Sequence, residues 1–181
     1  MKKIVIAGGT GMVGQALLDR LEELGYDVFL LSRKRHPKGY LWDPAKHYIE
    51  ESALHQSLAI INLAGAGIAD QCWTTHRKKI ITGSRVSAAE TFEKAFENPL
   101  NRPEVYLSAG AIGYYGNRDE EWLTESAQSG SDFLANSCIA WENAVQKLNK
   151  FPVRIAQFRI GIVLSTSGGA YEKMHLPYKF G

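Results

Sequence analysis

Apolar runs alternate with amphipathic segments along most of this chain. Short apolar runs that predict strands occupy residues 3–7, 28–31, 57–63, 105–108 and 153–158, with a shorter candidate at 40–42. Between them, apolar residues recur at helical spacing over residues 15–24, 74–96 and 132–149. Asn98-Pro99 and Phe151-Pro152 end the second and third helical segments. Strands alternating with helices predict an α/β fold, a doubly wound parallel sheet with helices on both faces.

A sheet of this kind binds its ligand at the carboxyl ends of the strands, near the point where the strand order reverses. Functional residues are therefore expected directly after the predicted strands. These positions follow Ala7, Leu31, Leu63, Leu107 and Phe158.

The first strand leads into a glycine-rich turn, Ala-Gly-Gly-Thr-Gly-Met-Val-Gly, over residues 7–14. Gly9, Gly11 and Gly14 fit the G-x-G-x-x-G spacing of dinucleotide sites, and Gly8, Gly11 and Gly14 fit G-x-x-G-x-x-G. Glycine permits a tight turn and lets a pyrophosphate approach the backbone at a helix N-terminus. A strand-to-helix turn without a ligand is the alternative, and a P-loop is disfavoured because no Gly-Lys-Ser/Thr follows. The expected contacts are Gly8, Thr10, Gly11, Met12 and Val13.

The second strand ends in Ser32-Arg33-Lys34-Arg35. An NAD site usually has an acidic residue here for the adenosine ribose, whereas a 2′-phosphate requires an arginine and a hydroxyl. The nearby acid, Asp27, opens the strand at the opposite pole. Ser32 and Arg33 therefore favour NADP through charge-assisted contacts, with a solvated basic loop as the alternative.

Later strand ends supply further candidates. The run at 57–63 leads into Leu63, Ala64 and Gly65, whose small side chains would let a dinucleotide lie against the strand. A helix after Trp73 carries Arg85, which would reach the cofactor if that helix lies over it. The fifth strand ends near Ser108 and is followed by Tyr114 and Tyr115. Core packing accounts for one of these tyrosines, and the other is a candidate to face substrate.

Composition sets the broad class. The 181 residues are 45% hydrophobic and 22% charged, as in an ordinary globular domain large enough for one core. A net charge of +2 with no long basic block argues against nucleic-acid binding. No apolar run approaches the roughly 20 residues of a membrane span, and no signal peptide is recognisable, so we expect a cytoplasmic protein without a membrane partner. Cys72 and Cys138 have no metal-ligand spacing. Homo-oligomerisation is left open.

The motifs resemble the extended short-chain dehydrogenase/reductases, also called the NAD-dependent epimerase/dehydratase family. The nearer resemblance is to its atypical branch, the epimerase family proteins or sugar-nucleotide epimerases. Residues 7–14, 62–73, 83–85, 111–116, 132–142 and 159–164 carry it. The resemblance implies a Rossmann-like fold in which Ser32 and Arg33 contact NADP and Leu63 and Ala64 line the cofactor. It also makes Arg85 and Arg159 cofactor candidates.

One departure from the family pattern concerns catalysis. The wider family uses a Tyr-x-x-x-Lys pair, in which the lysine lowers the pKa of the phenol. At the matching place this chain has Cys138 and Glu142. A thiol beside a carboxylate is held protonated, so we expect Cys138 to be a packed helix residue near Trp141 and Val145. The family's serine position falls on Gly110 or Ala111, which leaves Ser108 upstream of it.

Two functions fit these observations. One is an NADP-dependent oxidoreductase or epimerase acting on a small polar substrate, with a sugar nucleotide as the candidate and Tyr114 or Tyr115 as the catalytic residue. The other is a non-catalytic NADP(H)-binding sensor or regulator that lacks the usual dyad. We expect residues 1–165 to form the NADP-binding domain. Because family members continue into a substrate-covering lobe, residues 166–181 are expected to begin a truncated form of that lobe.

Overall fold

A seven-stranded sheet forms the centre of the computed structural model, which describes residues 2–166, 168–169, 171 and 178–179. The sheet order is β4-β3-β2-β1-β5-β6-β7, and every neighbouring pair is parallel except β3 with β4. The strands are β1 (Lys3–Ala7), β2 (Asp27–Ser32), β3 (Gly39–Asp43), β4 (Tyr48–Ile49), β5 (Ser57–Asn62), β6 (Val105–Ala111) and β7 (Arg154–Ile160). A small hairpin follows, β8 (Leu164–Ser165) with β9 (Gly168–Gly169).

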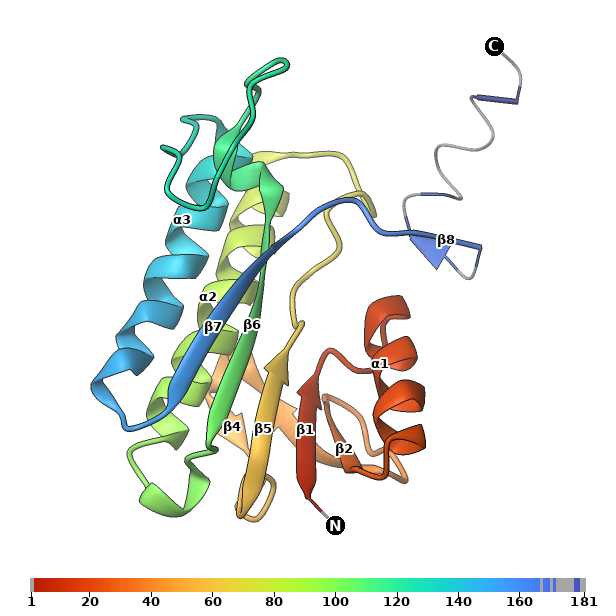
Figure 1. Ribbon diagram of the computed structural model, residues 1–181, viewed down its shortest axis with the longest axis vertical. Coiled ribbons are helices and arrows are strands. Elements are labelled where there is room, and N and C mark those ends of the chain that lie inside the picture. Colours follow the sequence, from red (N-terminus) through yellow and green to blue (C-terminus); the bar gives the residue numbers. More distant parts are fainter. Residues whose placement is uncertain (1, 167, 170, 172–177, 180–181) are drawn as a thin grey trace.

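Helices cover both faces of the sheet (Figure 1). One face carries α1 (Met12–Glu23), and the other carries α2 (Thr75–Ala95) and α3 (Phe133–Gln146). Side chains cap two of these helices: Thr74 accepts a hydrogen bond from the Arg77 N–H, and Asp132 from the Ala135 N–H. Short 3₁₀ helices are η1 (Pro44–Lys46), η2 (Pro99–Asn101), η3 (Ile112–Tyr115) and η4 (Lys147–Lys150).

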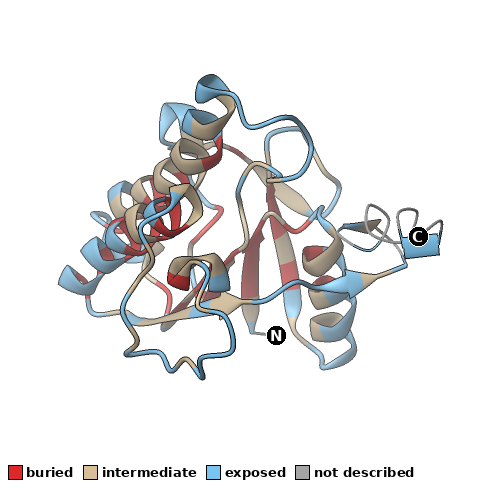
Figure 2. Cartoon of the chain, turned by 90° about the horizontal axis from the view of Figure 1, so that it is seen from above, coloured by how far each residue is buried: buried red, intermediate tan, exposed pale blue. Residues whose placement is uncertain are grey.

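The core has two layers, one on each side of the sheet. Under α2 and α3 it contains Phe92, Phe96 and Tyr106, whose rings pack at centroid distances of 5.3–6.2 Å. Under α1 it contains aliphatic residues such as Ile6 and Leu30. Figure 2 shows the buried residues concentrated in the sheet and on the helix surfaces that face it. Each strand contributes residues to both layers in turn, because successive side chains in a strand point to opposite faces of the sheet.

The predicted doubly wound α/β fold is confirmed, with differences at the strand ends. β6 continues to Ala111 and β7 to Ile160, because residues 108–111 pair in register with residues 157–160. The antiparallel strand β4 was not predicted, since two residues are too short to show a periodic pattern. The segment 166–181, expected to begin a substrate lobe, falls largely outside the described residues. Within the described part of the chain, no helix is long and apolar enough to cross a membrane.

Candidate functional site

A groove of about 1170 Å³ runs along the carboxyl ends of β1, β2, β3 and β5. The strand order reverses between β1 and β5, so the groove lies at the switch point of the sheet. Most of the expected cofactor residues line it, and these are Gly8, Thr10, Gly11, Ser32, Arg33, Leu63, Ala64 and Gly65.

The glycines of the first turn have different structural tasks. Gly8 has φ +78°, and a Cβ there would lie 2.9 Å from the backbone of Leu63. A Cβ on Gly14 would lie 2.5 Å from the Cα of Gly9, so this glycine lets α1 close on the turn. At Gly11 the nearest described atom to an added Cβ is the Gly8 carbonyl oxygen at 3.4 Å. Gly11 therefore leaves an open surface at the N-terminus of α1, where unpaired N–H groups favour an anion.

The end of β2 gives the groove a basic edge. Arg33, Lys34 and Arg35 are exposed and line the groove, as does His36. The Ser32 hydroxyl accepts a hydrogen bond from the Lys34 N–H at 3.2 Å, which turns the chain after the strand. Asp27 opens β2 and pairs in register with Lys3, at the opposite pole of the sheet. The edge thus presents cations where an NAD site usually presents a carboxylate.

A buried polar network fixes the end of β5. The Asn62 amide donates to the Tyr106 hydroxyl at 2.9 Å, and its carbonyl accepts from the Ala64 N–H at 3.1 Å. Complete burial raises the pKa of Tyr106 well above its ordinary value. The neutral phenol and the amide therefore satisfy each other and hold Ala64 at the groove wall.

Sequence reasoning missed two parts of the groove. One face of α2 lines it through Ile80, Gly83, Ser84 and Ser87. Their spacing of three, four and seven residues marks a helical face. A search for small residues at that spacing would have found Gly83, Ser84 and Ser87. The end of β3 also contributes, through residues 42–45. The rule that ligands bind at the carboxyl ends of strands would have located these residues as well.

Five expected contacts are not among the residues lining the groove: Met12, Val13, Arg85, Ser108 and Arg159. Met12 lies beside the hairpin, where a Cβ on Gly169 would be 3.2 Å from its sulfur. Ser108 is fully buried within β6, and its hydroxyl donates to the Ala109 carbonyl. Ser108 faces the core because alternate side chains of β6 point inward, and the strand continues for three residues beyond it.

Arg159 joins three elements at the carboxyl end of β7. Its Nε and Nη2 donate to the two carboxylate oxygens of Glu142 at 2.8 and 2.9 Å. Its Nη1 donates to the Tyr115 hydroxyl at 2.8 Å, and its guanidinium lies 3.5 Å from the ring centroid of Tyr114. The hydrogen bonds to Glu142 raise the pKa of Arg159. This arginine therefore ties η3 to α3, and its donors are used within the protein.

The place of the usual Tyr-x-x-x-Lys pair holds two buried residues. Cys138 is 6% exposed, and burial followed by the charge of Glu142 raises the pKa of its thiol. Glu142 is buried in its bidentate pair with Arg159. Of the two tyrosines, Tyr115 is buried and Tyr114 is half-buried. Neither Cys138 nor Glu142 is therefore placed to act as the phenol and ammonium of the usual dyad.

A family model described as the NAD dependent epimerase/dehydratase family matches residues 4–137. The chain belongs to this family. The resemblance seen in the sequence motifs is thus confirmed, and the family model spans the glycine turn and the strands from β1 to β6.

Individual relatives and solved structures agree with this assignment. An epimerase family protein of Staphylococcus epidermidis is 35% identical over 188 residues, which cover 99% of this chain and 61% of that protein. The crystal structure of human epimerase family protein SDR39U1 with NADPH has a TM-score of 0.86 at 28% identity, covering 99% of this chain and 60% of that one. A nucleoside-diphosphate sugar epimerase from Corynebacterium glutamicum has a TM-score of 0.85 at 31% identity, covering 99% and 38%. The chain therefore spans less than two thirds of the length of these relatives.

Proposed function

We propose that this chain is the NADP(H)-binding domain of an epimerase-like or oxidoreductase-type protein acting on a small polar substrate. The observation that carries the proposal is the groove, in which an open glycine turn and a basic strand end face the same space. The human relative solved with NADPH supports the cofactor. The relative named as a nucleoside-diphosphate sugar epimerase supports a sugar nucleotide as the substrate candidate.

The residues present fit a phosphorylated dinucleotide. The surface at Gly11, which a larger side chain would fill, receives the pyrophosphate at the N-terminus of α1. Arg33 pairs with the 2′-phosphate, and Ser32 at the strand end is the hydroxyl beside it. Leu63, Ala64 and Gly65 form the wall on the β5 side. The nicotinamide supplies hydride transfer when it is bound.

The cofactor proposal is tested by titrating NADP(H) and NAD(H) against wild type and Arg33→Ala. We expect wild type to prefer NADP(H), and the variant to lose about one to two decades of NADP(H) affinity, since a charge-assisted bond contributes roughly 1.5–3 kcal/mol. Arg154→Ala is the matched control, because Arg154 is exposed at the amino end of β7, far from the groove edge. Equal affinity of wild type for both cofactors would refute the proposal.

A second function, a non-catalytic NADP(H) sensor, is favoured by the buried Cys138 and Glu142 at the dyad positions. The two functions differ in turnover. If the protein is an enzyme, Tyr114→Phe or Tyr115→Phe should lower turnover about a hundredfold or more, because a phenol at the strand ends would supply the acid. Binding of NADPH without turnover of any carbonyl or sugar-nucleotide substrate in a broad panel would favour the sensor.

A further inference from the structure

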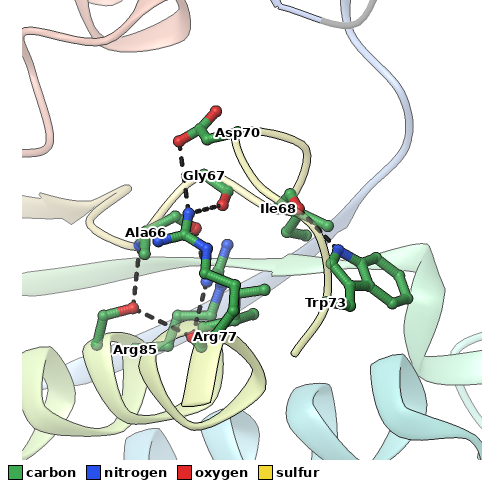
Figure 3. Close-up of polar contacts among 9 residues, drawn as sticks. Ala66, Gly67, Ile68, Asp70, Trp73, Arg77 and Arg85 are labelled. Atoms are coloured by element: carbon green, nitrogen blue, oxygen red, sulfur yellow. Dashed lines mark hydrogen bonds and ion pairs between the residues drawn. The ribbon is translucent and has the colours of Figure 1, made fainter. Parts of the chain in front are cut away.

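Side chains hold successive peptide groups of the loop between β5 and α2 (Figure 3). The Ala66 N–H donates to the Ser84 hydroxyl at 3.0 Å, and the Ala66 carbonyl accepts from Arg85 Nη1 at 3.0 Å. The Gly67 carbonyl accepts from Arg77, and the Ile68 carbonyl from the Trp73 indole N–H. The loop is therefore built against the first three turns of α2.

Arg85 is the centre of this arrangement. Its Nη1 also donates to the Ile81 carbonyl at 2.8 Å, and its guanidinium lies 5.2 Å from the ring centroid of Trp141 on α3. A Cβ on Gly65 would come within 2.9 Å of the guanidinium carbon, so the loop backbone lies directly on this side chain. Burial lowers the pKa of Arg85. A desolvated cation of this kind is costly, and its hydrogen bonds to the loop and helix carbonyls offset the cost.

The loop has two sides. One side, formed by residues 64–66, lines the groove, and the other lies on Arg85. Arg85 is not among the groove-lining residues. The contacts described above connect Arg85 to the groove through the backbone of Gly65 and Ala66.

We propose that Arg85 is a positioning residue, which holds residues 64–66 in the shape that binds the cofactor, with Arg77 fixing the next peptide. This inference rests on the proposed function. It adds a structural role to the direct cofactor contact that the sequence suggested for Arg85.

Arg85→Lys separates positioning from direct charge attraction. Lysine keeps the charge but lacks the planar guanidinium that lies against Gly65 and Trp141 and holds Nη1 between the Ala66 and Ile81 carbonyls. Arg102→Lys is the matched control: Arg102 donates to the carbonyls of Phe96 and Glu97, and it lies 5.1 Å from the ring centroid of Phe151, outside the groove.

The experiment measures the NADPH dissociation constant by calorimetry and the exchange of the Ala66 amide hydrogen in the full protein without nucleotide. We expect Arg85→Lys to weaken NADPH binding about tenfold and to speed Ala66 exchange, and Arg102→Lys to change neither by more than about twofold. Affinity retained in Arg85→Lys, or lost without faster Ala66 exchange, would overturn the positioning role. A wild-type protein that does not bind NADPH refutes the proposed function instead, while unchanged Ala66 exchange in Arg85→Lys still refutes the positioning role.

Discussion

Replacing Gly83 with alanine should make the protein more stable and its nucleotide complex weaker. Gly83 lies in the interior of α2 and lines the groove. Apart from its chain neighbours and the backbone of its own helix, no heavy atom of the described residues lies within 4 Å of the Cβ that this substitution would add. The added methyl group therefore causes no strain in the free protein and occupies space that the ligand needs.

The magnitudes follow from this geometry. Alanine is favoured over glycine in a helix interior by about 0.5–1 kcal/mol, because glycine loses more backbone entropy on folding. In a chain of 181 residues this raises the Tm by about 1–4 °C. One methyl group at the groove wall should weaken NADPH binding several-fold, and Gly83→Leu should weaken it by at least about tenfold.

Thermal unfolding without nucleotide and calorimetric titration with NADPH measure the two effects separately. Lys79→Leu is the control, because Lys79 is exposed on the same helix and is not a groove-lining residue. It should leave NADPH affinity unchanged. A lower Tm for Gly83→Ala, or tight NADPH binding by Gly83→Leu, would show that the reasoning about this helix face is wrong.

Three further predictions concern the glycine turn and the buried residues of α3. Gly11→Val should abolish NADPH binding with little change in Tm, whereas Gly14→Val should prevent folding, because the valine side chain would collide with Gly9. Circular dichroism measures the folding of each variant, and calorimetry measures its NADPH binding. Glu142→Gln should lower the free energy of unfolding in urea by about 2–3 kcal/mol, since it leaves the Arg159 charge without its partner, and a loss below about 0.5 kcal/mol would contradict this. Iodoacetamide at pH 8 should label the exposed Cys72 and spare Cys138, because burial raises the pKa of the Cys138 thiol and so keeps it protonated to higher pH than a free thiol. In urea both cysteines should react. Rapid labelling of Cys138 in the folded protein would contradict the prediction.

The parts of the site that the sequence predicted depend on local patterns. The glycine turn, the Ser32–Arg33 strand end and the Leu63–Gly65 wall each follow an apolar run directly, and all of them line the groove. A short apolar run followed by glycine or basic residues is sufficient to locate the carboxyl end of a strand. Parallel topology then brings these ends together.

The remaining parts depend on pairing between distant residues. Ser108 was placed at a strand end, but β6 continues because residues 108–111 pair with β7, which a window along one segment does not reveal. The family resemblance made Arg159 a cofactor candidate. Its partner Glu142 lies on a different element, α3, and the sequence does not show that the two residues pair. Arg85 was expected to reach the cofactor from a helix lying over it. The acceptors of its hydrogen bonds are backbone carbonyls, which no sequence pattern marks.

The position of β1 has a consequence for how the protein folds. The turn after β1 and the ends of β2 and β3 form one wall of the groove, and the loop after β5 and the α2 face form the other. The walls meet where β1 pairs with β5, in a register that joins Ala7 to Asn62. Forming such a long-range contact costs the entropy of closing a large chain loop. A chain in which β1 and β5 are not paired lacks the groove, so a ligand that binds the groove at 100 times its Kd stabilises the complete sheet by about 2.7 kcal/mol.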